Sequence, residues 1–257
     1  LRELLSQMGA PAVAPIEAQL LPHVQTWLLG EAGPTRLALG LEILAAVVEH
    51  AGKEHGKKYV LAAMPLLEQH VDSEEAGLRR AALFGLGCIA EHGGKLLTRN
   101  AAKDLAKKLL TVLEAPSARY SGNVEASEAA AAALGKVLVH RPQAVAEAGM
   151  AVFLPTWLGW LPLRYSEDDH RAAIGCLCKL LEAEAGAVLG TDGGRFPAVL
   201  GAMTAAYESE LTGGETSSRM RTIVQGWNAS NPEALRASAA SLSAAQQEKL
   251  GRMASVA

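Results

Sequence analysis

Cysteine and histidine are the residues of this chain that could support metal binding or nucleophilic chemistry. Cys176 and Cys178 form a Cys-x-Cys pair, but two residues along a helix turn the chain by about 200°, so the two thiols point to nearly opposite faces and cannot readily chelate one ion. His50, His92 and His140 each stand near the predicted end of a helix, where the helix dipole favours an imidazolium. We expect core packing for the cysteines and structural roles for the histidines.

Known catalytic signatures are absent from the sequence. It contains no His-Glu-x-x-His, Gly-x-Ser-x-Gly or Gly-x-x-x-x-Gly-Lys-[Ser/Thr] motif, and the glycine-rich segment 190–196 lacks the lysine that a phosphate loop requires. We therefore predict that the chain is not an enzyme and needs neither cofactor nor metal.

The composition predicts a folded, soluble all-α protein. Of its 257 residues 49% are hydrophobic and 20% charged, and only 4% are aromatic; alanine and leucine dominate, which favours helices. The net charge of -3 gives no general attraction to nucleic acid or anionic lipid. Three cysteines are typical of a reducing, intracellular compartment. No apolar run reaches the roughly 18 residues of a membrane span. The missing initiator Met suggests a segment of a longer protein.

An internal repeat of about 42 residues organises the chain. An apolar residue followed by proline occurs at 21–22, 64–65, 154–155 and 196–197, and we expect each pair to open a helical stretch. The long interval between 65 and 155 is two periods, with a similar helix around Leu109 at its midpoint. A second marker, Glu-His-Ala-Gly at 49–52 and Glu-His-Gly-Gly at 91–94, closes helices in step with the first.

Helix pairs with this period indicate a HEAT or armadillo-type α-solenoid, a right-handed superhelix of antiparallel pairs. We predict a single array over 1–257 with about five repeats, ended by a capping helix and tail at 231–257. Segments 72–75, 166–169 and 231–233 carry helix-start signals. In the helix at 124–140, we expect Glu125, Glu128 and Lys136 to face outward.

Two tryptophans lie in Leu-Pro-Thr-Trp-Leu-Gly-Trp-Leu-Pro-Leu, residues 154–163. We predict a helical stretch at about Gln143 to Leu161, opened or kinked at Pro155. Trp157 and Trp160 then share one flank of the helix and fill the junction between successive repeats. An aromatic-binding pocket on the outer surface is the functional alternative, and a membrane-surface role is disfavoured because basic clusters do not flank the segment.

Residues 115–163 resemble the C-terminal HEAT repeats of karyopherin-β (importin-β) nuclear transport receptors, specifically the importin beta-3 branch. The resemblance rests on Ala-Pro-Ser-Ala-Arg at 115–119, Asn-Val-Glu-Ala-Ser-Glu at 123–128, Ala-Leu-Gly-Lys at 133–136 and the tryptophan segment. It extends into 170–190 and 242–250. Ser127, Glu128 and Ala129 depart from the Thr-Glu-Asn that the family usually carries.

The resemblance implies a carrier of protein cargo through the nuclear pore, shuttling between cytoplasm and nucleus as a monomer. It implies three kinds of partner: cargo with basic localisation signals on the concave face, the GTPase Ran, and Phe-Gly nucleoporins on the convex face, the last two through the full-length receptor. Because the second helix of each pair usually lines the concave side, exposed acidic residues there would suit basic cargo. The candidate protein-binding residues are Glu125, Glu128, Asp168, Arg171, Glu182, Trp157 and Trp160.

Two other classes of protein could use the same solenoid. One is a scaffold subunit of a phosphatase-type complex, which would be indifferent to Ran. The other is a HEAT-like DNA glycosylase, in which Trp157, Trp160 and Asp168 would act on a damaged base. The basic segments 53–58 and 103–108 lie near or on first helices, on the expected outer side, and argue against the glycosylase.

Overall fold

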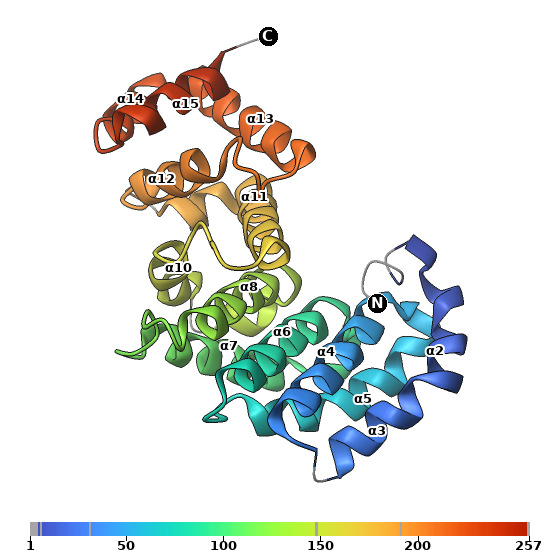
Figure 1. Cartoon of the computed structure of the whole chain (residues 1–257). Coiled ribbons are helices and arrows are strands. Elements are labelled where there is room, and N and C mark those ends of the chain that lie inside the picture. Colours follow the sequence, from blue (N-terminus) through green and yellow to red (C-terminus); the bar gives the residue numbers. More distant parts are fainter. Residues whose placement is uncertain (1–4, 6, 31, 147–148, 191, 256–257) are drawn as a thin grey trace. The chain divides into compact units, whose positions relative to one another are not determined.

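The computed structural model describes residues 5, 7–30, 32–146, 149–190 and 192–255, and within these ranges the regular structure is helical throughout. The chain divides into two compact units, unit 1 over residues 1–144 and unit 2 over 145–257, and each is described by itself (Figure 1). In the described ranges no helix has both the length and the apolar character needed to cross a membrane. The prediction of a single continuous array stays a prediction.

Unit 1 is built from helix pairs in which a first helix packs on a second helix. Its helices are η1 (Ala10–Ala12), α2 (Val13–Gln19), α3 (Leu21–Leu29), α4 (Pro34–His50), α5 (Gly52–His70), α6 (Ala76–His92), η2 (Gly94–Leu96), α7 (Arg99–Glu114) and α8 (Val124–His140). The pairs are α3 with α4, α5 with α6, and α7 with α8. The short helix α9 (Pro142–Ala146) spans the point where the chain divides.

Unit 2 continues the pattern of paired helices. It contains α10 (Met150–Leu158), α11 (Glu167–Leu189), α12 (Phe196–Ala206), α13 (Gly214–Ser230), α14 (Pro232–Ala239) and α15 (Ala244–Ala254). Helix α11 packs on α10, α12 and α13, while α14 and α15 cover α12 and α13. The predicted terminal capping helix at 231–257 is therefore two helices.

The core of unit 1 runs along its second helices, because α6 packs against both α4 and α8 (Figure 1). Small residues allow this close approach: a Cβ placed on Gly87 of α6 would lie 3.1 Å from both Cα and Cβ of Ala133 on α8. Every residue from 81 to 90, and from 126 to 138, is buried. These helices are thus covered on nearly all sides.

Two of the three predicted helix starts have a side-chain cap. The Ser166 hydroxyl accepts the backbone N–H of Asp169, and the Asn231 side chain accepts that of Ala234. These two caps satisfy N–H groups that have no partner within the helix. Helix α6 begins at Ala76, directly after the acidic segment 72–75, so its first turn holds no acidic residue, and its N-cap Glu75 makes no side-chain cap hydrogen bond.

The proline marker was only half right as a sign of helix starts. Pro22 and Pro197 lie in the first turns of α3 and α12, where a missing N–H costs nothing. Pro65 and Pro155 instead lie inside α5 and α10. The segment predicted as one kinked stretch from Gln143 to Leu161 is divided between α9 and α10, and α10 follows Gly149, whose φ of 79° suits glycine.

Candidate protein-binding surfaces

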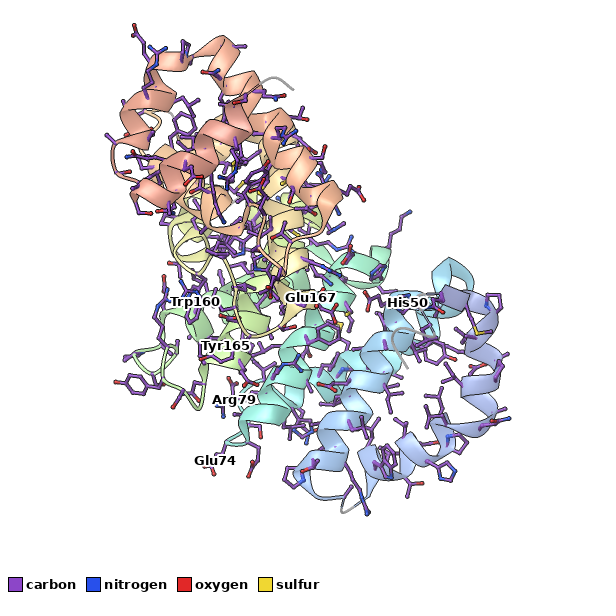
Figure 2. The ribbon with its side chains drawn as sticks, turned by 45° about the horizontal axis from the view of Figure 1, so that its top comes forward. His50, Glu74, Arg79, Trp160, Tyr165 and Glu167 are labelled. Atoms are coloured by element: carbon purple, nitrogen blue, oxygen red, sulfur yellow. The ribbon has the colours of Figure 1, made fainter. Side chains whose placement is uncertain are left out.

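Three features of unit 1 offer places for a partner: a pocket between inter-helix connections, a charge cluster at the ends of the second helices, and an apolar groove on the first helices. We call them the turn pocket, the end cluster and the outer groove. Figure 2 shows Glu74 and Arg79 of the turn pocket and His50 of the end cluster at opposite ends of the second helices.

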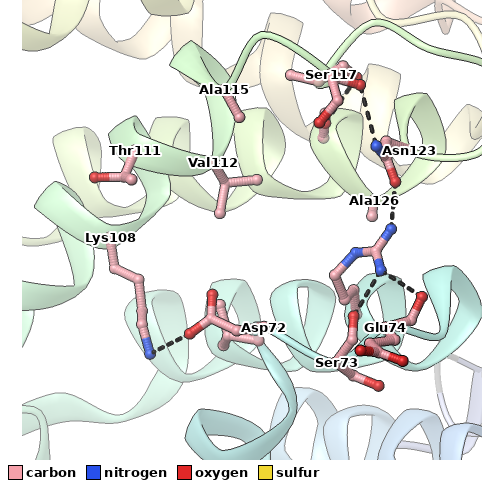
Figure 3. A pocket seen from close by; sticks show the side chains of 14 residues that line it. Asp72, Ser73, Glu74, Lys108, Thr111, Val112, Ala115, Ser117, Asn123 and Ala126 are labelled. Carbon is pink, nitrogen blue, oxygen red and sulfur yellow. Dashed lines mark hydrogen bonds and ion pairs between the residues drawn. The ribbon is translucent and has the colours of Figure 1, made fainter.

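The turn pocket has a volume of about 610 Å³ and lies between the α5–α6 turn, the end of α7 and the loop that precedes α8 (Figure 3). Arg79 joins the two connections. Its Nη1 donates to the carbonyls of Ser73 at 2.6 Å and Glu74 at 2.8 Å, and its Nη2 donates to the Asn123 side chain. The Asn123 amide then donates to the Ser117 carbonyl at 3.1 Å.

The loop at 115–123 is also fastened to α8, because the Ser127 hydroxyl donates to the Ala118 carbonyl at 3.0 Å. Val112, Ala115 and Ala126 give the pocket apolar walls (Figure 3), while the Lys108–Asp72 ion pair at 3.6 Å stands at its rim. A mixed lining of this kind suits a peptide side chain with one polar end.

The end cluster joins α4, α6 and α8 where each of these helices ends. Lys136 Nζ lies 3.0 Å from Glu91 Oε2, and His140 Nε2 lies 3.5 Å from Glu91 Oε1. His92 is 3.7 Å from Glu91, and His50 is 3.7 Å from Glu49 on α4. The three histidines do end second helices as predicted, and the fold brings two of them to one carboxylate.

The pKa values of Lys136 and Glu91 are shifted in the directions that keep both groups of this ion pair charged. Burial by itself lowers the pKa of Lys136, but Cys88, Glu91 and Glu49 outweigh burial and hold it above the ordinary value. Burial raises the pKa of Glu91, yet Lys136 and the histidines bring it below the ordinary carboxyl value. Among the described residues no group of three or more His, Cys, Asp and Glu side chains is arranged to hold a metal ion.

The outer groove lies between α3 and α5 and has a volume of about 420 Å³. Leu28, Leu29, Pro65 and Leu66 contribute to a lining that is almost entirely apolar, and Leu29 is 71% exposed. Pro65, which the sequence marked as a helix start, lies inside α5 and lines this groove. An exposed leucine beside an apolar groove is typical of a surface that receives an apolar side chain.

The predicted acidic residues do not all face solvent. Glu125 and Asp168 are exposed, but Glu128 is only 5% exposed and Lys136 only 8%, so the expectation that these two face outward was wrong. The reason is that the alanine-rich helix α8 receives both α6 and α7. Helices with small side chains approach closely enough to bury their polar positions too.

On α11 the predicted residues Arg171 and Glu182 are exposed, but both already form ion pairs within the chain. Arg171 pairs with Glu167 one turn earlier and donates to the Leu211 carbonyl at 3.3 Å. Arg219 of α13 donates to both carboxylate oxygens of Glu182, at 3.0 and 2.7 Å. This two-pronged pair offsets the negative charge that Glu182 would offer to basic cargo.

The tryptophans belong to the core, in line with the preferred interpretation. Trp157 is fully buried and Trp160 is 6% exposed, so neither forms the wall of an outer aromatic pocket. They are not available to stack on an extruded base either, which removes the residues that the glycosylase alternative required. Cys176 and Cys178 are also buried, and burial raises the pKa of the Cys178 thiol to about 11.

Sequence reasoning missed the residues that shape the turn pocket and the outer groove. Arg79 and Asn123 lie 44 residues apart, one repeat length, and that periodicity was the available signal. Residues 115–119 and 123–128 contributed to the family resemblance, but the arginine that fastens this loop was not singled out.

Comparison with known proteins defines the class of fold. No model of a protein family matches the chain. The chain is similar to the solved structure "Crystal structure of Kap121p bound to RanGTP", with a TM-score of 0.67 over 98% of this chain and 18% sequence identity. The similarity shows the fold alone, an arrangement of paired helices of the HEAT-repeat type. This chain spans 22% of the length of that neighbour.

Proposed function

We propose that this chain is a protein-binding segment of a nuclear transport receptor that carries protein cargo through the nuclear pore under the control of Ran. The observation that carries the proposal is the likeness of nearly the whole chain to a karyopherin that was crystallised with RanGTP. In this proposal the chain is not an enzyme, and the full-length receptor shuttles as a monomer between cytoplasm and nucleus. The importin beta-3 branch is the finer assignment.

Two different surfaces of unit 1 could bind the two kinds of partner that such a carrier needs. The second helices end in carboxylates and histidines. Glu49, at the end of α4, is partly exposed and could contact a basic cargo segment, while Glu91 is already paired with Lys136. The outer groove, on the first helices, has the apolar lining that a Phe-Gly nucleoporin would require. Cargo and nucleoporin would then contact different helices.

Ran dependence is the property that tests the carrier proposal. The full-length protein is immobilised and exposed to cell extract, then washed with Ran locked in its GTP form or with buffer alone. We expect a set of proteins to be released by RanGTP and retained without it. Bound proteins that RanGTP leaves in place would instead favour a scaffold subunit with a constitutive partner.

The groove is tested with a synthetic Phe-Gly repeat peptide and the 257-residue chain. We expect Leu29→Glu to weaken peptide binding at least about tenfold, because a carboxylate would enter an apolar groove. Leu61→Glu is the matched control, since Leu61 is 58% exposed on α5 but does not line the groove. Equal binding by the two variants would remove the groove from the proposal.

A further inference from the structure

A second pocket of unit 1 has a basic lining. It has a volume of about 470 Å³ and lies where the segment leading into α7 meets the residues that follow α8. Lys95, Arg99, His140 and Arg141 all line it, and no acidic side chain is among the described residues that do so. Four groups that carry or can acquire positive charge thus surround one cavity.

The local fold builds this pocket from both sides. Gly94, with φ of 54°, allows the tight turn of η2 that carries Lys95. Arg99 Nε donates to the Gln143 carbonyl at 3.1 Å and so ties the first turn of α7 to the segment after α8. Buried Leu97, Ala102 and Ala144 contribute an apolar base.

Arg141 contributes two buried hydrogen-bond donors to this pocket that lack an acceptor. Its Nε and Nη2 atoms are both buried and have no hydrogen-bond partner among the described residues. Burial lowers the pKa of this arginine. A buried N–H without an acceptor costs free energy that a bound anion would recover.

The carboxylate of Glu91, which pairs with His140, is already engaged by another residue. Glu91 lies 3.5 Å from His140, but its Oε2 is held by Lys136 at 3.0 Å. The N-terminal end of α7, 16 residues long, adds the positive end of a helix dipole, and its cap residue Thr98 lines the pocket. The carbonyls at the C-terminal end of α8 carry partial negative charge and oppose the binding of an anion. One of them, the Val137 carbonyl, accepts a hydrogen bond from the Arg141 backbone N–H.

We propose that this pocket binds a phosphate group, either free or carried on a phosphorylated side chain, with Arg141 donating two hydrogen bonds from Nε and Nη2. Arg99 and Lys95 supply further positive charge at the exposed side. The planar guanidinium fork matches two oxygens of a tetrahedral phosphate. The volume accommodates a phosphate group together with the side chain that bears it. This site does not depend on the proposed carrier function.

The direct test observes the arginine side chains of the 257-residue chain by nuclear magnetic resonance. Inorganic phosphate is titrated against sodium chloride of equal ionic strength. We expect the Arg141 Nε–H signal to move in a saturable way with phosphate and not with chloride. An Arg141 signal that stays in place with phosphate would overturn the proposal.

Two variants assign the site. Arg141→Gln removes the fork and is expected to weaken phosphate binding at least about tenfold, whereas Arg36→Gln removes an equal charge from the exposed surface of α4 and should leave it unchanged. Equal weakening by both would show a general charge effect and contradict the proposal. If Arg141→Gln does not fold, Arg141→Lys keeps the charge but loses the fork, and the wild-type signal still decides the outcome.

A phosphoserine peptide and its unphosphorylated form distinguish the two sources of phosphate. Tighter binding of the phosphopeptide than of inorganic phosphate identifies a phosphorylated protein as the ligand. Binding of inorganic phosphate alone identifies the free anion. If both peptides bind with equal affinity and inorganic phosphate does not bind, the phosphate group is not recognised, which contradicts the proposal.

Discussion

Single residues carry the electrostatic organisation of unit 1. The side chain of Lys136 is 10% exposed and has Glu91 as its charge partner at 3.0 Å. The chain offers a comparison in the more exposed pair of Arg80 with Glu42, 2.8 Å apart, in which the side chains are 29% and 40% exposed. The two pairs have similar geometry but different access to water, and their free energies should differ accordingly.

Replacing Glu91 with Gln is expected to destabilise the protein by about 2 kcal/mol, because a nearly buried ammonium loses its charge partner. The same change at Glu42 should cost less than about 1 kcal/mol, since solvent screens that pair. Urea denaturation of both variants measures the difference. Equal losses would show that burial of Lys136 does not matter.

The pH dependence of stability is a second prediction for single residues. The pKa of His92 is below the ordinary 6.5, because burial and then Lys136 disfavour the imidazolium more than Glu91 favours it. The unfolded chain therefore binds the proton at higher pH, and the free energy of unfolding falls as the pH decreases through 6.5.

His92→Gln should make this fall shallower between pH 7.5 and 5.5, an interval that spans the ordinary histidine pKa. Unfolding midpoints at several pH values provide the measurement. His23→Gln, on the exposed surface of α3, serves as the control and should leave the slope as it is. A slope that His92→Gln does not change would contradict the assignment.

At the scale of helices, the contact between α6 and α8 depends on the absence of a side chain. Gly87→Ala would place a Cβ 3.1 Å from the Cα of Ala133, and we expect a loss of about 1–3 kcal/mol. Gly77→Ala, in the first turn of the same helix, meets no atom within 4 Å. It should stabilise the protein by about 0.5–1 kcal/mol through helix propensity. Thermal unfolding of the two variants distinguishes the effect of close packing from that of helix propensity. If both variants were more stable than the wild type, the close contact at Gly87 would be refuted.

The loop at 115–123 is the other feature at this scale. Arg79→Lys keeps the charge but loses the fork that reaches both the α5–α6 turn and Asn123. Faster hydrogen exchange is expected for the loop amides, with little change in the core of α8. Lys108→Ala removes only the exposed rim pair with Asp72 and should leave the loop amides protected.

At the scale of the whole molecule, terminal helices close the stack of repeats in unit 2. Leu235, Leu250 and Met253 of α14 and α15 are buried, and these helices cover α12 and α13. Ending the chain after Ser230 should therefore expose apolar surface and destabilise α12 and α13. Hydrogen exchange should rise in those helices, while the helices of unit 1 keep their protection. Loss of protection in unit 1 alone would contradict this account.

Much of this fold could be predicted from the chain because a HEAT repeat is a local unit. A helix around Leu109 and a helix at 124–140 could be predicted because apolar residues recur there at helical spacing. The cap at Ser166 follows from residue type. The candidate sites were less predictable. Glu128 has an outward position on an isolated helix and becomes buried only when α6 and α7 pack on α8.

The sequence by itself determined the all-α class, the repeat of about 42 residues and the histidines at the ends of second helices, since these depend on neighbours along the chain. Only the tertiary structure decided which side chains meet: Glu91 with Lys136, Arg79 with Asn123, and Arg141 with its basic neighbours. The physical reason is that contacts about one repeat apart depend on how closely helices pack. That distance is set by side-chain volume across the interface, which the periodicity of one helix does not contain.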